Sequence, residues 1–262
     1  MKYYKKSLGQ NFLTDQNILD KIVNLTNIKD KNVLEIGPGH GALTDRILEK
    51  KPKTLILIEK DNLLSEKLKV KYNNRRNIKI YNNDILKINM EDKLKKNTII
   101  FGNLPYNISS QILVKLIKFK IWPPKYSSLI LMFQKEMAER ISGKFGTKKY
   151  GRISILSYFR LKIFKQFDVS PNSFFPKPKI FSTLIYFKPK EKTFNRINDI
   201  ANLEKITNIF FSNRRKMINK NIKNVLNNLS SQELIKNFKL NSRPSDLEPE
   251  KYYKITELFE KI

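Results

Sequence analysis

The chain has 262 residues, with 52 lysines and arginines against 24 aspartates and glutamates, which gives a formal net charge of +28. It has no cysteine, which excludes disulfides, thiolate metal sites and a cysteine nucleophile. It also lacks a run of about 18 apolar residues, the length that a helix needs to span a bilayer. We therefore expect a cytoplasmic protein that makes no use of a membrane.

The excess of positive charge is typical of proteins that bind a phosphate backbone and displace its counterions. A gene whose base composition favours lysine codons would produce part of the same excess, so both explanations stay open at this point. Of the possible partners, the charge favours nucleic acid.

Strands and helices alternate through the first part of the chain. Short apolar segments, which are typical of strands, alternate with stretches whose apolar residues recur at helical spacing. The segments predicted as strands are residues 33–36, 53–59, 78–81, 98–101, 128–133 and 183–187. This alternation predicts an α/β fold with a parallel, doubly wound sheet. Residues 154–161 are apolar and fit a helix or a strand equally well.

The pattern changes after residue 189. Pro176, Pro178 and Pro189 interrupt the alternation around the last predicted strand. From about Asn202 onward, apolar residues recur at helical spacing only. We therefore expect two domains, a sheet domain at residues 1–189 and a small all-helical C-terminal domain at residues 190–262.

A glycine-rich turn follows the first predicted strand and precedes a predicted helix. Gly37, Gly39 and Gly41 stand there in the order EIGPGHG. Glycines let a ligand approach the backbone, and the N-terminus of a helix offers free N–H groups. The spacing differs from the dinucleotide fingerprint, and the ending of a P-loop is absent. The turn indicates a nucleotide-type site, although an ordinary tight turn would look the same.

Two carboxylates follow at the ends of the next two strands. Glu59 ends the second predicted strand, from where a carboxylate can accept hydrogen bonds from both hydroxyls of a ribose. Asp84 follows the third strand at the same edge of the sheet. Singly, each could be a turn or capping residue. Together with Gly37 they predict an S-adenosylmethionine site, with the ribose on Glu59 and the adenine amine on Asp84.

The sequence NLPY at residues 103–106 follows the fourth predicted strand. The lone pair of an adenine N6 amine is delocalised into the ring, so the amine needs help to act as a nucleophile. The side-chain oxygen of Asn103 and the backbone carbonyl of Leu104 could accept from its two N–H groups and favour the developing positive charge. Tyr106 would offer an aromatic face to a base taken out of its helix. A simple turn is the alternative for this segment taken alone.

These motifs resemble the rRNA adenine N6,N6-dimethyltransferase family of the bacterial small-subunit (16S) type. The resemblance runs from about residue 7 to the end and is carried by residues 10–13 (QNFL), 35–39 (EIGPG), 103–109 (NLPYNIS), 134–136 (QKE), 174–179 (FFPKPK) and 214–216 (RRK). It implies a Rossmann-like methyltransferase sheet that uses S-adenosylmethionine as methyl donor and needs no metal.

The resemblance also assigns roles to individual residues. The implied cofactor site comprises Asn11, Leu13, Gly37, Glu59, Asp84 and Asn103. The implied catalytic group comprises Asn103, Leu104, Tyr106 and Phe174, with Phe174 facing Tyr106 across the target base. Arg214, Arg215 and Lys216 are expected to contact RNA phosphates from a helical stretch, which would position the RNA without reading its sequence.

The resemblance implies a housekeeping enzyme of ribosome biogenesis, because QKE and RRK are similar to the maturation enzymes of the family. Such an enzyme dimethylates N6 of two adjacent adenines in the 3′-terminal hairpin loop of small-subunit (16S) rRNA. We expect it to act within the immature small subunit and as a monomer. Two alternatives stay open: a large-subunit rRNA adenine methylase that confers antibiotic resistance, and a non-catalytic ribosome assembly factor.

Overall fold

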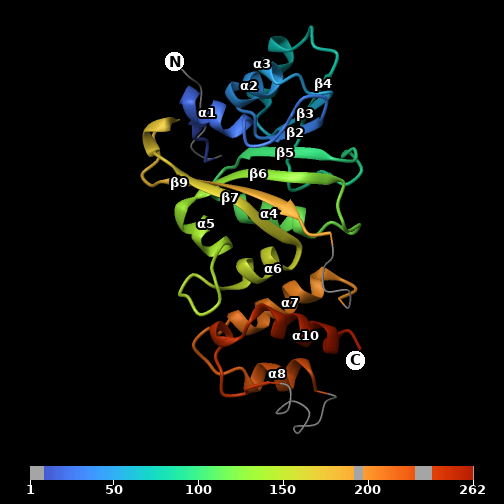
Figure 1. Ribbon diagram of the computed structural model, residues 1–262, viewed down its shortest axis with the longest axis vertical. Coiled ribbons are helices and arrows are strands. Elements are labelled where there is room, and N and C mark those ends of the chain that lie inside the picture. The colour runs from blue at the N-terminus through green and yellow to red at the C-terminus, as the bar shows by residue number, and fades with distance from the viewer. Residues whose placement is uncertain (1–8, 192–196, 228–237, 262) are drawn as a thin grey trace. The chain divides into compact units, whose positions relative to one another are not determined.

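The computed structural model describes residues 9–191, 197–227 and 238–261 (Figure 1). The chain forms two compact units. The first comprises residues 1–115, 123–138 and 163–189, and the second comprises residues 116–122, 139–162 and 190–262. Two internal segments, at residues 116–122 and 139–162, therefore group with the C-terminal residues. Within the described part of the chain, no helix is long and apolar enough to cross a membrane.

A seven-stranded sheet in the order β4-β3-β2-β5-β6-β9-β7 organises the first unit. Its strands are β2 (Asn32–Ile36), β3 (Thr54–Glu59), β4 (Ile78–Asn82), β5 (Thr98–Asn103), β6 (Tyr126–Gln134), β7 (Leu161–Val169) and β9 (Ser182–Pro189). Helix α1 (Gln16–Val23) precedes β2. The helices that follow between strands include α2 (Ala42–Glu49), α3 (Asn62–Lys71), α4 (Ser109–Ile117) and α5 (Lys135–Ile141). The predicted α/β class and all six predicted strands are confirmed.

The sheet is mixed. Strands β2 to β6 pair in parallel, whereas β9 runs antiparallel to β6. The ambiguous segment at residues 154–161 divides between helix α6 (Arg152–Arg160) and the start of β7. Strand β7 was not predicted from the sequence. Most of its residues are exposed, so it lacks the continuous apolar run of an inner strand.

The strand order places a ligand-binding edge at the centre of the sheet. Strand β2 pairs with β3 on one side and with β5 on the other, so the connections leave β2 in opposite directions. Ligands of open α/β sheets bind at such a switch point, beside the carboxyl ends of the strands. Strands β2 and β5 are buried almost throughout, which gives this edge a rigid support.

The second unit is helical in its C-terminal part. Helices α7 (Ile200–Phe211), α8 (Asn219–Val225) and α10 (Pro249–Phe259) follow one another, with a 3₁₀ turn at Pro244–Asp246, and residues 197–227 and 238–261 contain no strand. Phe210 of α7 meets Tyr252 of α10 edge-on, with ring centroids 5.6 Å apart. Buried aromatic pairs of this kind stabilise a helical core beyond the area that they bury.

The prediction that Arg214, Arg215 and Lys216 lie in a helical stretch is wrong. Helix α7 ends at Phe211, α8 begins at Asn219, and a turn joins them. The Ser212 hydroxyl donates to the Ile209 carbonyl, a side-chain bond that competes with continuation of the helix. Arg214 donates from Nη2 to the carbonyls of Lys148 (2.8 Å) and Tyr150 (2.9 Å), which holds the turn. Arg215 and Lys216 are exposed.

Candidate active site

A cavity opens at the carboxyl ends of strands β2 to β5. Its empty volume is about 940 Å³, including solvent at its mouth, which suits a small-molecule ligand. It is lined by residues 9–12 of the N-terminal arm (residues 9–14), the glycine turn after β2, the ends of β3 and β4, and the end of β5 with the segment after it. The predicted site residues that line it are Asn11, Gly37, Glu59, Asp84, Asn103, Leu104 and Tyr106.

Two of the predicted cofactor and catalytic residues do not line this cavity. Leu13 lies in strand β1 (Phe12–Leu13), and Phe174 lies in strand β8 (Phe174–Phe175), opposite Leu13 in an antiparallel pair. Both are 4% exposed and belong to the hydrophobic core of the first unit. Phe12, the neighbour of Leu13, lines the cavity instead. Because side chains alternate along a strand, Phe12 and Leu13 face opposite sides of β1.

The backbone conformation of the turn and the residues packed around it both require glycine at these positions. Gly37 and Gly39 have φ angles of +68° and +60°, which residues with a Cβ rarely adopt. A Cβ at Gly39 would lie 2.7 Å from the ring of Phe12. The Gly39 N–H donates to the Glu59 carboxylate at 3.1 Å. These contacts bring the turn, the arm and β3 together at one wall of the cavity.

The Glu59 side chain is almost completely buried, at 6% exposed, and it accepts two backbone hydrogen bonds. Oε1 accepts from the Asp61 N–H at 2.8 Å, and Oε2 accepts from Gly39. Burial raises the pKa of Glu59 despite these bonds. A carboxylate oxygen can accept more than one bond, so Glu59 can also receive ligand hydroxyls in the cavity. This acceptor suits the two hydroxyls of a ribose.

Asp84 provides a second acidic wall. Its side chain is 15% exposed, accepts from the Leu86 N–H at 2.9 Å and forms an ion pair with Lys60 at 2.9 Å. Burial by itself would raise the pKa of Asp84, but the Leu86 N–H and the Lys60 ammonium outweigh it and hold the pKa below its ordinary value. Asp84 is therefore ionised at neutral pH and can accept from an amine.

The side chain of Asn103 is oriented by the arm. Its Nδ2 donates to the Asn11 carbonyl at 2.8 Å, which makes Oδ1 the end left for a ligand. Among the residues that the structure describes, none donates a hydrogen bond to this Oδ1. The Leu104 side chain is 2% exposed, and it packs where a Cβ on Gly102 would come within 2.6 Å of it. Gly102 thus leaves room for the Leu104 side chain, a role that the motif alone did not reveal.

Tyr106 is held in place by the last strand of the sheet. Its hydroxyl lies 2.7 Å from the Ser182 hydroxyl at the start of β9. Burial raises the pKa of Tyr106, so the phenol stays neutral at physiological pH. A neutral, fixed ring on the cavity wall presents a face on which a planar base can stack.

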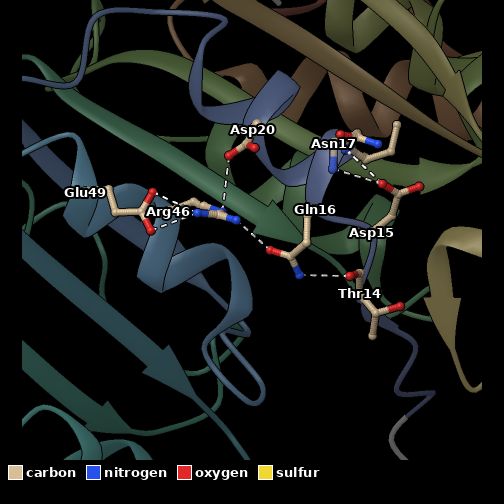
Figure 2. Close-up of polar contacts among 8 residues, drawn as sticks. Thr14, Asp15, Gln16, Asn17, Asp20, Arg46 and Glu49 are labelled. Carbon is tan, nitrogen blue, oxygen red and sulfur yellow. Dashed lines mark hydrogen bonds and ion pairs between the residues drawn. The ribbon is translucent and has the colours of Figure 1, made fainter.

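The arm is anchored through a polar network centred on Arg46 of helix α2 (Figure 2). Arg46 forms ion pairs with Asp20 (3.2 Å) and Glu49 (2.9 Å) and donates to Gln16 Oε1 (2.8 Å). Gln16 in turn donates from Nε2 to the Thr14 carbonyl at 3.0 Å. Helix α2 is therefore linked to α1 and to the base of the arm. Apart from the Arg46–Glu49 pair within α2, sequence patterns gave no signal for this network, because the other partners come from α1 and the arm.

A second buried carboxylate lies behind the glycine turn. Glu35 of β2 is 2% exposed, and its Oε2 accepts from the Thr44 hydroxyl at 2.6 Å. Burial raises the pKa of Glu35 to about 8, against the lowering effect of Thr44. The folded state therefore keeps a proton that the unfolded chain releases above its ordinary pKa of about 4.5.

We expect the stability of the protein to fall as the pH rises from about 4.5 to about 8, because in this range the folded state binds more protons at Glu35 than the unfolded state does. The slope from this group is at most about 1.4 kcal/mol per pH unit. Glu35→Gln should remove this pH dependence, so the free energy of unfolding of the variant should rise relative to that of the wild type as the pH rises. Denaturant unfolding at about pH 5.5 and about pH 7.5 measures this. Glu66→Gln, at an exposed ion pair with Lys69, is the control. The expectation would be contradicted if Glu35→Gln and the wild type differed in free energy of unfolding by the same amount at both pH values.

The parallel part of the sheet with its switch point, the glycine turn and the acidic strand ends define a Rossmann-like methyltransferase. The family model described as "Ribosomal RNA adenine dimethylase" matches residues 1–261. The chain belongs to this family, as its motifs predicted.

Two curated relatives and one solved structure support the assignment. "Ribosomal RNA small subunit methyltransferase A" of Pelagibacter ubique is 49% identical over 263 residues, which cover 98% of this chain and 97% of that protein. The protein of the same name from the Wolbachia of Brugia malayi is 39% identical over 253 residues, with 95% and 94% covered. The crystal structure of a dimethyladenosine transferase from Plasmodium falciparum superposes with a TM-score of 0.75 at 27% identity, covering 93% of this chain and 95% of that one.

The chain is therefore an S-adenosylmethionine-dependent rRNA adenine dimethyltransferase. The hydrogen-bond acceptors of the cavity suit this cofactor, since Glu59 can accept from ribose hydroxyls and Asp84 from an amine. Among the described residues, no cluster of three or more histidines, aspartates and glutamates could hold a metal ion.

Proposed function

We propose that this enzyme dimethylates N6 of two adjacent adenines in the 3′-terminal hairpin loop of small-subunit (16S) rRNA. The names of the relatives that align over nearly the whole chain support the choice of subunit. The observation that carries the chemistry is the fixed Asn103 side chain, whose amide nitrogen is engaged by Asn11 and whose oxygen is left on the cavity wall. The enzyme acts within the immature small subunit, in the cytoplasm and as a monomer.

The residues after β5 prepare the target amine. Asn103 Oδ1 and the Leu104 carbonyl accept from its two N–H groups and hold it in one orientation, which favours the positive charge that develops on nitrogen. Bound S-adenosylmethionine supplies an electrophilic methyl group on a sulfonium. Each transfer forms a bond from N6 to carbon, breaks the bond from that carbon to sulfur, and releases one proton from the amine.

Two aromatic residues hold the base. Tyr106 stacks on one face of the adenine once it has left its helix, because the reacting atom is otherwise out of reach. Phe174 provides the opposite face. Since Phe174 is 4% exposed, this role requires its ring to turn out of the core when RNA binds.

The remaining roles follow from the walls of the cavity. Glu59 binds the ribose hydroxyls, Asp84 binds the adenine amine of the cofactor, and Gly37 leaves space near its methionine part. Asn11 closes the site from the arm, and Leu13, whose side chain packs in the core, contributes through its backbone. We further propose that residues 1–189 carry methyl transfer and that residues 190–262 position RNA, with Arg214, Arg215 and Lys216 on its phosphates.

The test is transfer of labelled methyl from S-adenosylmethionine to purified small subunits that lack the modification, with large subunits in parallel. Mass spectrometry of the digested RNA locates the product. We expect dimethyladenosine in the 3′ hairpin of the small subunit. Label in the large subunit would indicate a resistance methylase, and binding without label would indicate an assembly factor.

A further inference from the structure

An exposed apolar segment runs from the end of β8 to the residue before β9. Phe175, Ile180 and Phe181 are 44%, 43% and 49% exposed, and all three fall within one short stretch of chain. We call these three residues the rim patch. Soluble proteins rarely expose several large apolar side chains together unless the surface binds something. The neighbouring Phe174 is buried in the core of the first unit, whereas the three residues of the rim patch stay exposed.

One end of the rim patch lies next to a residue that contacts the wall of the active-site cavity. Phe181 directly precedes Ser182, whose hydroxyl bonds to that of Tyr106 on the cavity wall. The Phe181 carbonyl also accepts from the backbone N–H of Lys135 at 3.0 Å, which fixes the backbone at this point. Because consecutive Cα atoms are about 3.8 Å apart, the Phe181 side chain starts next to the residue that holds Tyr106.

The charge around the rim patch suits a polyanion. Lys177 and Lys179 are exposed within the segment, and residues 170–182 contain no aspartate or glutamate. The Lys135 ammonium lies 5.8 Å from the centre of the Phe181 ring and forms an ion pair with Asp168. Aromatic faces among lysines are typical of surfaces that bind single-stranded nucleic acid, where bases stack and lysines meet phosphates. An apolar protein partner would not need the lysines.

We propose that Phe181, flanked by Ile180, is a stacking platform for a nucleotide next to the target adenine, with Lys177 and Lys179 on the neighbouring phosphates. This inference rests on the proposed function. When the target base leaves its stack, its neighbour loses a stacking partner, and the platform replaces that partner. The platform therefore lowers the cost of presenting the target to Asn103 and binds RNA without reading its sequence.

The test compares Phe181→Ala with a matched control, Phe164→Ala. Phe164 is 58% exposed, and Lys188 lies 4.3 Å from the centre of its ring, so it has the same chemical features. It belongs to β7 and packs against Tyr186, further along β9 from the Ser182 end. We expect Phe181→Ala to raise the KM for small subunits on the order of ten-fold, the loss of one stacked base. The KM for S-adenosylmethionine and the kcat should stay near wild type. Phe181→Trp should restore the KM, and Phe164→Ala should leave it unchanged.

Binding of the same variants to protein-free small-subunit rRNA completes the test. We expect the same order of weakening there for Phe181→Ala. An effect on subunits without one on protein-free RNA would overturn the proposal and assign the rim patch to a ribosomal protein. An unchanged KM in Phe181→Ala, or an equal loss in Phe164→Ala, would overturn it as well. If the wild type transfers no methyl to small subunits, the proposed function itself fails, a result distinct from all of these.

Discussion

Replacement of Asn103 by alanine is expected to lower the kcat of methyl transfer by about 100- to 1,000-fold, the usual effect of removing one group that stabilises a transition state. The Asn103 oxygen is the acceptor that we place on the target amine, and its nitrogen is already bound to the Asn11 carbonyl. RNA binding should be largely intact, because the residues that we propose for the phosphate contacts lie elsewhere in the chain. Single-turnover transfer to small subunits, with RNA affinity measured separately, gives both quantities.

Asn32→Ala is the matched control for this variant. Asn32 stands at the amino end of β2, where it bonds to Thr54 and to the Lys96 carbonyl, far along the strand from the site edge. Its loss should leave turnover near wild type. Asn103→Asp adds a finer test, since it keeps an acceptor but removes the donor to Asn11. Turnover at the wild-type rate by Asn103→Ala would remove the proposed role of this side chain.

Replacement of Glu59 by glutamine is expected to raise the Kd for S-adenosylmethionine by about 10- to 100-fold, although glutamine has nearly the same shape. Both carboxylate oxygens accept backbone N–H groups, from Asp61 and from Gly39. A glutamine amide has only one oxygen, so its NH₂ must face one of these donors. The variant loses a bond to the glycine turn or to Asp61, and also an acceptor for a ribose hydroxyl, each worth about 1 to 3 kcal/mol.

Isothermal titration with S-adenosylmethionine measures the affinity, and denaturant unfolding measures the accompanying loss of stability. Glu66→Gln is the control, because Glu66 of α3 is exposed and forms an ion pair with nearby Lys69. Exposed pairs of this kind contribute little, so the control should match wild type. An unaltered Kd in Glu59→Gln would show that the cofactor does not depend on this carboxylate.

The predicted site residues that lie at strand ends meet in the structure for a simple reason. Glu59 and Asp84 follow neighbouring parallel strands, and the carboxyl ends of such strands share one edge. Gly37 directly follows β2 and Asn103 ends β5, and these two central strands are adjacent, which the alternation alone did not predict. The sequence therefore predicted that residues at the ends of successive parallel strands share one edge of the sheet, but it did not predict which strands are neighbours.

The residues that lie outside the strand ends were harder to place. The QNFL segment suggested Leu13 for the site, but strand alternation turns Leu13 into the core and Phe12 toward the cavity. A two-residue strand is too short to reveal its own alternation in the sequence. Arg214 illustrates the same limit, since its bonds to the Lys148 and Tyr150 carbonyls come from a distant part of the chain.

The sequence by itself determined what depends on near neighbours. Asp15 and Asp61 cap the helices that follow them within a few residues, and Gly39 takes a left-handed conformation that few other residues adopt. Only the tertiary structure decided the contacts between Asn103 and Asn11 and between Tyr106 and Ser182. Such bonds join segments far apart in the chain, and their energy is gained only after the sheet has brought the segments together. The local pattern therefore predicted which residues could do chemistry, and packing decided which of them meet.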